Sequence, residues 1–84
     1  MNRIEAIQKL INIAKDLNGD WKPSWNFTHQ IKWFIYYNVG WNPGYRSAST
    51  IVNNQCLVYF KSKELVEQVI KNYKHLLDQA YELN

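Results

Sequence analysis

The fold is decided by residues 30–38, whose sequence is Gln30-Ile31-Lys32-Trp33-Phe34-Ile35-Tyr36-Tyr37-Asn38. Large apolar and β-branched side chains recur here with a period of two, which is typical of a β-strand with one buried face. The set predicted to face a core is Ile31, Trp33, Ile35 and Tyr37. The set predicted to face outward includes Lys32, Phe34 and Tyr36.

Two further strands are predicted after this one. Pro43-Gly44 suits the two central positions of a type II turn, so the chain should reverse there. The following strands are expected over residues 45–52 and 55–61. Asn53-Asn54 between them can form a two-residue hairpin turn, because Asn tolerates positive φ. The three strands would form an antiparallel meander.

The turn at Asn53-Asn54 also predicts which residues share a face, since a slip of one residue would exchange the two faces. It sets Ser47 opposite Phe60. The core face would then carry Ile51, Cys56, Val58 and Phe60. The outer face would carry Arg46, Ala48, Thr50, Leu57, Tyr59 and Lys61.

One helix is predicted before the meander in the sequence and one after it. Residues 3–17 carry apolar side chains at helical spacing, and Asn18-Gly19 gives a left-handed stop. Ser62 is a good N-cap for a second helix that should run from Lys63 almost to the C-terminus. We therefore predict one α+β domain over residues 1–84, in the order α-β-β-β-α, with both helices packed on one face of the sheet.

Composition limits the class of protein. The chain has 84 residues, 46% hydrophobic and 20% charged, with a net charge of +3, which suits one compact domain and not a disordered polyelectrolyte. No run approaches the roughly 20 apolar residues of a membrane helix. A single cysteine excludes an internal disulfide framework. We expect a soluble cytoplasmic protein without membrane partners.

Residues for catalysis or metal binding are few. The two histidines, His29 and His75, have no nearby nucleophile pattern, and Cys56 is predicted inside the sheet. Residues 16–20 space their oxygen side chains as calcium loops do, but the glycine is misplaced and Phe27 stands where the bidentate Glu belongs. We expect no enzymatic activity, no metal and no cofactor.

The outer face of the sheet is the main candidate binding surface. Aromatic and cationic side chains are interleaved on it, namely Lys32, Phe34, Tyr36, Arg46, Tyr59 and Lys61. This mixture suits a protein interface, and it also suits a platform that stacks bases and pairs phosphates. A third reading is that loop tryptophans cover the face.

Two other aromatic groups raise further alternatives. The second helix is longer than the sheet, and its overhang with Tyr73 and Tyr81 is a second candidate interface, including one with another copy of the chain. The loops carry Trp21, Trp25, Phe27 and Trp41. We expect these loop rings to close the edges of the core, and sugar stacking is the alternative.

Two stretches carry a resemblance to a known group of proteins. They are Asn18-Gly19-Asp20-Trp21-Lys22-Pro23-Ser24-Trp25-Asn26 and Val58-Tyr59-Phe60-Lys61-Ser62-Lys63-Glu64-Leu65. With the Tyr-rich strand between them, they resemble small uncharacterised proteins of bacteriophages and mobile elements, although Asn53-Asn54 replaces the usual Gly of the hairpin turn. The resemblance implies an inhibitor of a host defence nuclease or ribonucleoprotein, of the anti-CRISPR type, acting by steric docking in the host cell.

Overall fold

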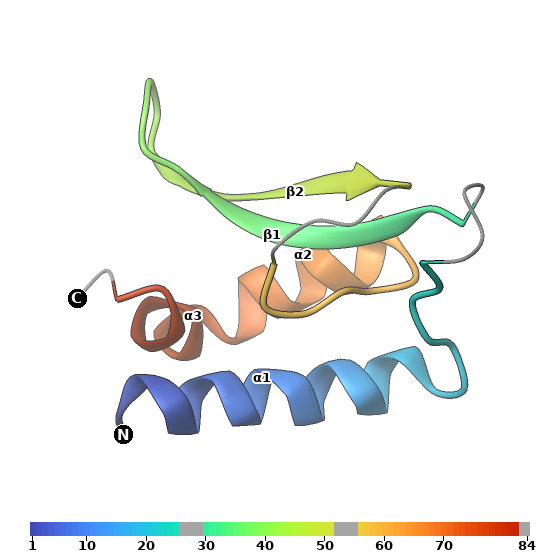
Figure 1. Ribbon diagram of the computed structural model, residues 1–84. Coiled ribbons are helices and arrows are strands. Elements are labelled where there is room, and N and C mark those ends of the chain that lie inside the picture. Colours follow the sequence, from blue (N-terminus) through green and yellow to red (C-terminus); the bar gives the residue numbers. More distant parts are fainter. Residues whose placement is uncertain (26–29, 52–55, 83–84) are drawn as a thin grey trace.

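A computed structural model describes residues 1–25, 30–51 and 56–82 (Figure 1). In chain order its elements are α1 (Arg3–Asn18), β1 (Lys32–Asn38), β2 (Gly44–Thr50), α2 (Lys63–Asn72) and α3 (Lys74–Ala80). The α+β class is confirmed, and the three helices lie on the same side of the sheet (Figure 1). No helix in these ranges is both long enough and apolar enough to span a membrane.

Helix α1 agrees with its sequence pattern. The side chain of Asn2 accepts a hydrogen bond from the backbone N–H of Glu5 and so caps the first turn. Gly19 ends the helix with φ at 61°, and its N–H donates to the Lys15 carbonyl. The buried face of α1 packs Ala6, Leu10 and Ala14 against the core.

Strands β1 and β2 form a two-stranded antiparallel sheet. Ile35 lies opposite Ser47, and Tyr37 lies opposite Tyr45. Ile35 and Tyr45 are buried beneath the sheet, and Trp33 and Tyr37 pack against the core, so the predicted alternation is confirmed for these residues of β1. Ile31 precedes the first residue of β1 and is 54% exposed, so its predicted core position is wrong. The turn is placed differently from the prediction: Gly44 already pairs with Asn38 inside the sheet, and Asn42 takes the positive φ of 58°.

The predicted third strand is not found among the described residues, where segment 56–62 is irregular. Phe60 lies opposite Trp33 of β1, and two backbone bonds of 2.9 and 2.8 Å join them. The predicted pairing of Phe60 with Ser47 is therefore wrong, and the segment flanks β1 instead of β2. Ile51 is exposed, which contradicts its predicted core position. The Asn53-Asn54 turn lies outside the described residues.

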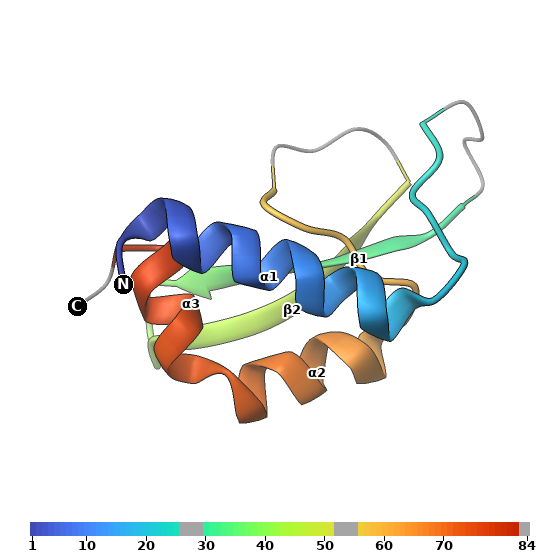
Figure 2. The same ribbon diagram turned by 90° about the horizontal axis from the view of Figure 1, so that it is seen from below.

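The predicted long C-terminal helix is two helices. Tyr73 leaves the helical region at φ −129° and ψ 35°, and it separates α2 from α3. Helix α2 packs under both strands, while α3 turns to pack against α1 (Figure 2). The break lets one chain segment cover the sheet and also reach α1.

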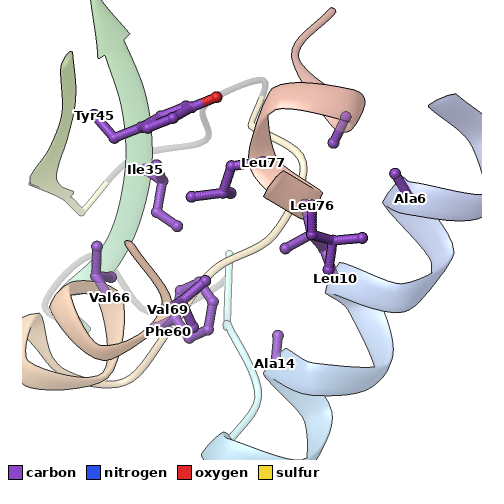
Figure 3. Packing of buried hydrophobic residues seen from close by; sticks show 11 residues of the cluster. Ala6, Leu10, Ala14, Ile35, Tyr45, Phe60, Val66, Val69, Leu76 and Leu77 are labelled. Atoms are coloured by element: carbon purple, nitrogen blue, oxygen red, sulfur yellow. The ribbon is translucent and has the colours of Figure 1, made fainter. Parts of the chain in front are cut away.

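One hydrophobic core joins all of these elements (Figure 3). Phe60 is fully buried at its centre, between Val69 of α2 and the side chains of α1 and α3. The buried apolar residues are Ala6, Leu10, Ala14, Ile35, Tyr45, Phe60, Val66, Val69, Leu76, Leu77 and Ala80.

Candidate interaction surface

The outer face of the sheet carries most of the residues predicted for it. Phe34 lies opposite Ala48 and Tyr36 lies opposite Arg46, all on the side away from Ile35. Tyr59 reaches this side from segment 56–62 and meets the Phe34 ring edge-on, with centroids 6.3 Å apart. We define the outer face as Trp25, Lys32, Phe34, Tyr36, Arg46 and Tyr59.

The aromatic rings of the outer face form a continuous chain. Trp25 packs on Tyr59 in a T-shaped pair at 5.1 Å, and Phe34 contacts both Tyr59 and Tyr36, the latter at 6.5 Å. Trp25 and Tyr36, at the two ends, are 42% and 41% exposed. The loop tryptophan thus covers one part of the face and extends its aromatic surface.

Lys32 is on this face but does not present a charge to solvent. Its side chain is fully buried, and its Nζ donates to the carbonyls of Gln30 at 3.0 Å and Ile51 at 3.4 Å. The ammonium also lies 4.6 Å from the centroid of the Trp25 ring, within cation–π range. Lys32 therefore fastens the Trp25 loop to the sheet.

Arg46 is likewise turned toward the protein. Its Nη2 donates to the Asn42 carbonyl at 2.6 Å, and its Nη1 donates to its neighbour Tyr45's carbonyl at 3.1 Å. Lys61 lies past the pairing of Phe60 with Trp33, and its backbone N–H donates to Asn18 at the end of α1. The backbone of Lys61 thus belongs to that junction, while its side chain is exposed.

The tip of the β1–β2 hairpin is a feature that the sequence analysis missed. Within this tip, residues 39–43, Val39 is 80% exposed and Trp41 is 94% exposed. The side-chain amide of Asn38 donates to the carbonyls of Trp41 and Asn42, while Arg46 holds Asn42 from the other strand. Trp41 does not close the core, contrary to prediction. The exposed Trp41 ring therefore lies on a turn whose backbone carbonyls accept hydrogen bonds from Asn38 and Arg46.

The two residues of the predicted second interface, Tyr73 and Tyr81, differ in exposure. Tyr81 is half-buried, packs edge-on against Tyr45 at 5.6 Å, and its hydroxyl donates to the Ile35 carbonyl at 2.7 Å. Burial raises the pKa of Tyr81 to about 12. Tyr73 is 38% exposed at the junction of α2 and α3. Only Tyr73 is therefore placed to meet a partner.

The groups that could support catalysis include Cys56, Tyr45 and Asp78. Cys56 is half-buried, burial raises the pKa of its thiol, and its backbone N–H donates to the Tyr59 hydroxyl. The carboxylate of Asp78 accepts a hydrogen bond from the Tyr45 hydroxyl at 2.6 Å, and this bond joins α3 to β2. The pKa of Tyr45 is raised, mainly by burial and secondly by this hydrogen bond. Across the described ranges no three His, Cys, Asp or Glu residues gather as metal ligands. Phe27 and His29 lie outside those ranges.

Comparison with known proteins gives no relative. No family model, no curated protein and no solved structure matches the chain.

Proposed function

We propose that this is a non-enzymatic binding protein that docks on a larger protein through its outer face and hairpin tip. The observation that carries the proposal is the contrast between rings and charges on this surface. Trp25, Tyr36 and Trp41 present aromatic area to solvent, whereas Lys32 and Arg46 are bound to backbone carbonyls of the protein itself. Exposed Trp and Tyr side chains are the preferred anchors of protein interfaces.

The same contrast favours a protein partner over single-stranded nucleic acid. Binding of nucleic acid depends on cations that neutralise phosphates and release counterions. To do so, Lys32 would have to leave a fully buried position, and Arg46 already donates two of its hydrogen bonds to backbone carbonyls. An apolar protein surface can pack on the rings without disturbing either side chain.

The partner that we propose is a host defence nuclease or ribonucleoprotein, such as a CRISPR effector, in the cytoplasm of a bacterial host. This rests on the resemblance of residues 18–26 and 58–65 to small bacteriophage proteins. A steric inhibitor needs exposed anchor side chains and no catalytic group, and the outer face supplies such anchors in Trp25, which packs on Tyr59, and in Tyr36.

The proposal is tested by capture of host proteins, followed by a cleavage assay with each purified nuclease that is captured. Wild type is compared with Tyr36→Ala and Trp41→Ala, and Ile4→Ala serves as the control because Ile4 is an exposed apolar residue of α1. We expect each aromatic change to weaken nuclease inhibition by tenfold or more. Loss of an interface anchor commonly costs about 1.4 kcal/mol of binding free energy or more, which corresponds to a tenfold loss of affinity. Equal inhibition by folded outer-face and tip variants would refute the docking surface.

Titration with a fluorescent oligothymidylate at low and high salt tests the nucleic-acid alternative. We expect no saturable binding at low salt. Binding that weakens steeply as salt rises, and that Tyr36→Ala reduces, would replace the protein-docking proposal with the nucleic-acid one.

A further inference from the structure

A groove of about 530 Å³ lies on the helical side of the molecule, away from the outer face. It is lined by residues of α1 and of the junction between α2 and α3. The break at Tyr73 accounts for it, because α2 stays beneath the sheet while α3 turns toward α1 (Figure 2). The groove is thus a consequence of the same break that separates the two C-terminal helices.

The floor of this groove is apolar. Ile13 of α1 and Leu76 of α3 contribute aliphatic side chains, and Tyr73 contributes a ring that is 38% exposed. Apolar area that a ligand removes from water contributes about 25 cal/mol per Å². A ligand with apolar side chains would therefore gain free energy on this floor.

The rim of the groove is cationic. Lys9, Lys71 and Lys74 line it, and no Asp or Glu does. Lys9 and Lys71 form no ion pair within residues 1–25, 30–51 and 56–82. Lys74 lies 3.6 Å from Asp78, but its side chain is 71% exposed, so the pair is screened and contributes little. The lysines are thus available to a negatively charged ligand.

We propose that the groove binds an acidic amphipathic segment of a partner protein. Its apolar side chains would lie on Ile13, Tyr73 and Leu76, and its carboxylates would face the three lysines. Amphipathic helices bind apolar grooves in this way, and the charged rim sets which helices are accepted. This inference is independent of the proposed function, because it concerns a different surface.

Two other occupants are less well matched. Single-stranded nucleic acid is also anionic, and Tyr73 and His75 offer rings on which a base can stack, but the aliphatic Ile13 and Leu76 between the lysines suit apolar side chains better than bases. A second copy of the chain would bring the same lysines to a symmetric contact, where they would repel one another. The lysines of the rim and the apolar side chains of the floor together favour the acidic amphipathic peptide.

The test uses a rhodamine-labelled peptide of about 14 residues, with Leu at i, i+3, i+4 and i+7, three or four Glu on the flanking positions and Ala elsewhere to favour a helix. Anisotropy titrations compare wild type with the double variant Lys9→Gln/Lys71→Gln. The matched control is Lys15→Gln/Lys63→Gln, which removes two exposed lysines outside this groove. We expect the groove variant to bind about tenfold more weakly and the control to bind as wild type does.

Further arms separate the occupants. Replacing every Glu of the peptide by Gln should abolish binding, and Tyr73→Leu should retain peptide binding because the floor stays apolar. Tyr36→Ala should leave peptide affinity unchanged, which separates this result from failure of the proposed function. The inference is overturned if wild type shows no saturable peptide binding, if the groove variant binds equally well, or if oligothymidylate binds the groove more tightly than the peptide. Concentration-dependent dimerisation that Lys9→Gln/Lys71→Gln strengthens would also overturn it, in favour of a second copy.

Discussion

Lys32 is fully buried although its place on the outer side of β1 suggested a solvent-exposed cation. Its ammonium is held by two backbone carbonyls and the Trp25 ring. Burial of an ammonium costs free energy, and its hydrogen bonds offset that cost. Lys32 therefore contributes little to the free energy of unfolding, and its main effect is to position the loop that carries Trp25.

Lys32→Met should change global stability by only about 1 kcal/mol, because relief of the desolvation cost compensates for the lost bonds. Amide exchange of residues 20–25 should become faster, since their attachment to the sheet is weakened. Exchange measured by mass spectrometry and unfolding in urea provide the readouts. Lys61→Met is the control, because Lys61 is exposed. Unchanged exchange in Lys32→Met would show that Lys32 does not fasten the loop.

Tyr81 makes stability depend on alkaline pH. Burial raises its pKa from 10.0 to about 12, so the folded state keeps the phenol proton over a range in which the unfolded state loses it. The stabilisation is complete below pH 10 and is lost as the pH rises toward 12. The raised pKa of Tyr45 acts in the same direction.

We expect the free energy of unfolding to fall by about 1–2 kcal/mol between these two pH values. Tyr81→Phe should be less stable at neutral pH, because the bond to the Ile35 carbonyl is lost, and its stability should fall less over the same range. Urea unfolding followed by circular dichroism measures both effects. An identical decrease in Tyr81→Phe would exclude Tyr81 as a source.

At the scale of elements, Asn18 joins the end of α1 to segment 56–62. The buried side chain donates to the Tyr59 carbonyl at 2.9 Å and accepts from the Lys61 N–H at 3.0 Å. Asn18→Ala should cost about 1–3 kcal/mol because both backbone groups lose their partner. Asn12→Ala, at an exposed position of the same helix, should cost nothing measurable in the same denaturation assay. Asn18→Asp should not restore stability, since its carboxylate would face the Tyr59 carbonyl.

The hairpin offers a matched pair of glycines. A Cβ on Gly44 would lie 2.7 Å from Nη1 of Arg46, and Gly44 has a φ of 158°. Gly44→Ala should therefore cost about 1–2 kcal/mol, chiefly because a side chain is strained at this φ, and Arg46 must also move away from the new Cβ. A Cβ on Gly40 meets only Asn38, at 3.7 Å, so Gly40→Ala should be tolerated. Thermal midpoints of the two variants would decide this, and equal midpoints would contradict the argument.

Local sequence signals predicted the elements that local rules control. Helix α1 has a stripe and a glycine stop, and β1 has a strict period of two, so both were found within two residues. The break at Tyr73 was missed because the apolar stripe continues through it and no Gly or Pro marks it. Segment 56–62 was misplaced because its pairing with β1 depends on the packing of Phe60, which no local pattern encodes.

The candidate surface was predicted by the same logic and with the same limits. Alternation on β1 placed Phe34 and Tyr36 on the outer face correctly. The burial of Lys32 and the exposure of Trp41 depend on how the loops fold back, and residue type alone does not specify either. The groove at Tyr73 required the helix break and could not be predicted without it.

At the scale of the whole molecule, the core is shared by every element. Phe60 and Leu77 are fully buried in one cluster that also contains residues of α1, both strands and α2. We therefore expect a single cooperative unfolding transition, with near-ultraviolet and far-ultraviolet circular dichroism giving the same midpoint. Separate midpoints would mean that α1 or the hairpin unfolds independently of the rest.

The exposure of Trp41 has a practical consequence. An indole that is 94% exposed on a structured turn is open to collisional quenchers, whereas Trp33 packs against the core. A partner that covers the hairpin tip would shield Trp41 from acrylamide and shift its emission to shorter wavelengths. A ligand confined to the groove on the helical side would leave that indole quenchable. Because the chain has four tryptophans and Trp25 is also 42% exposed, the difference in quenching between the natural sequence and Trp41→Phe tells the two binding events apart without a label.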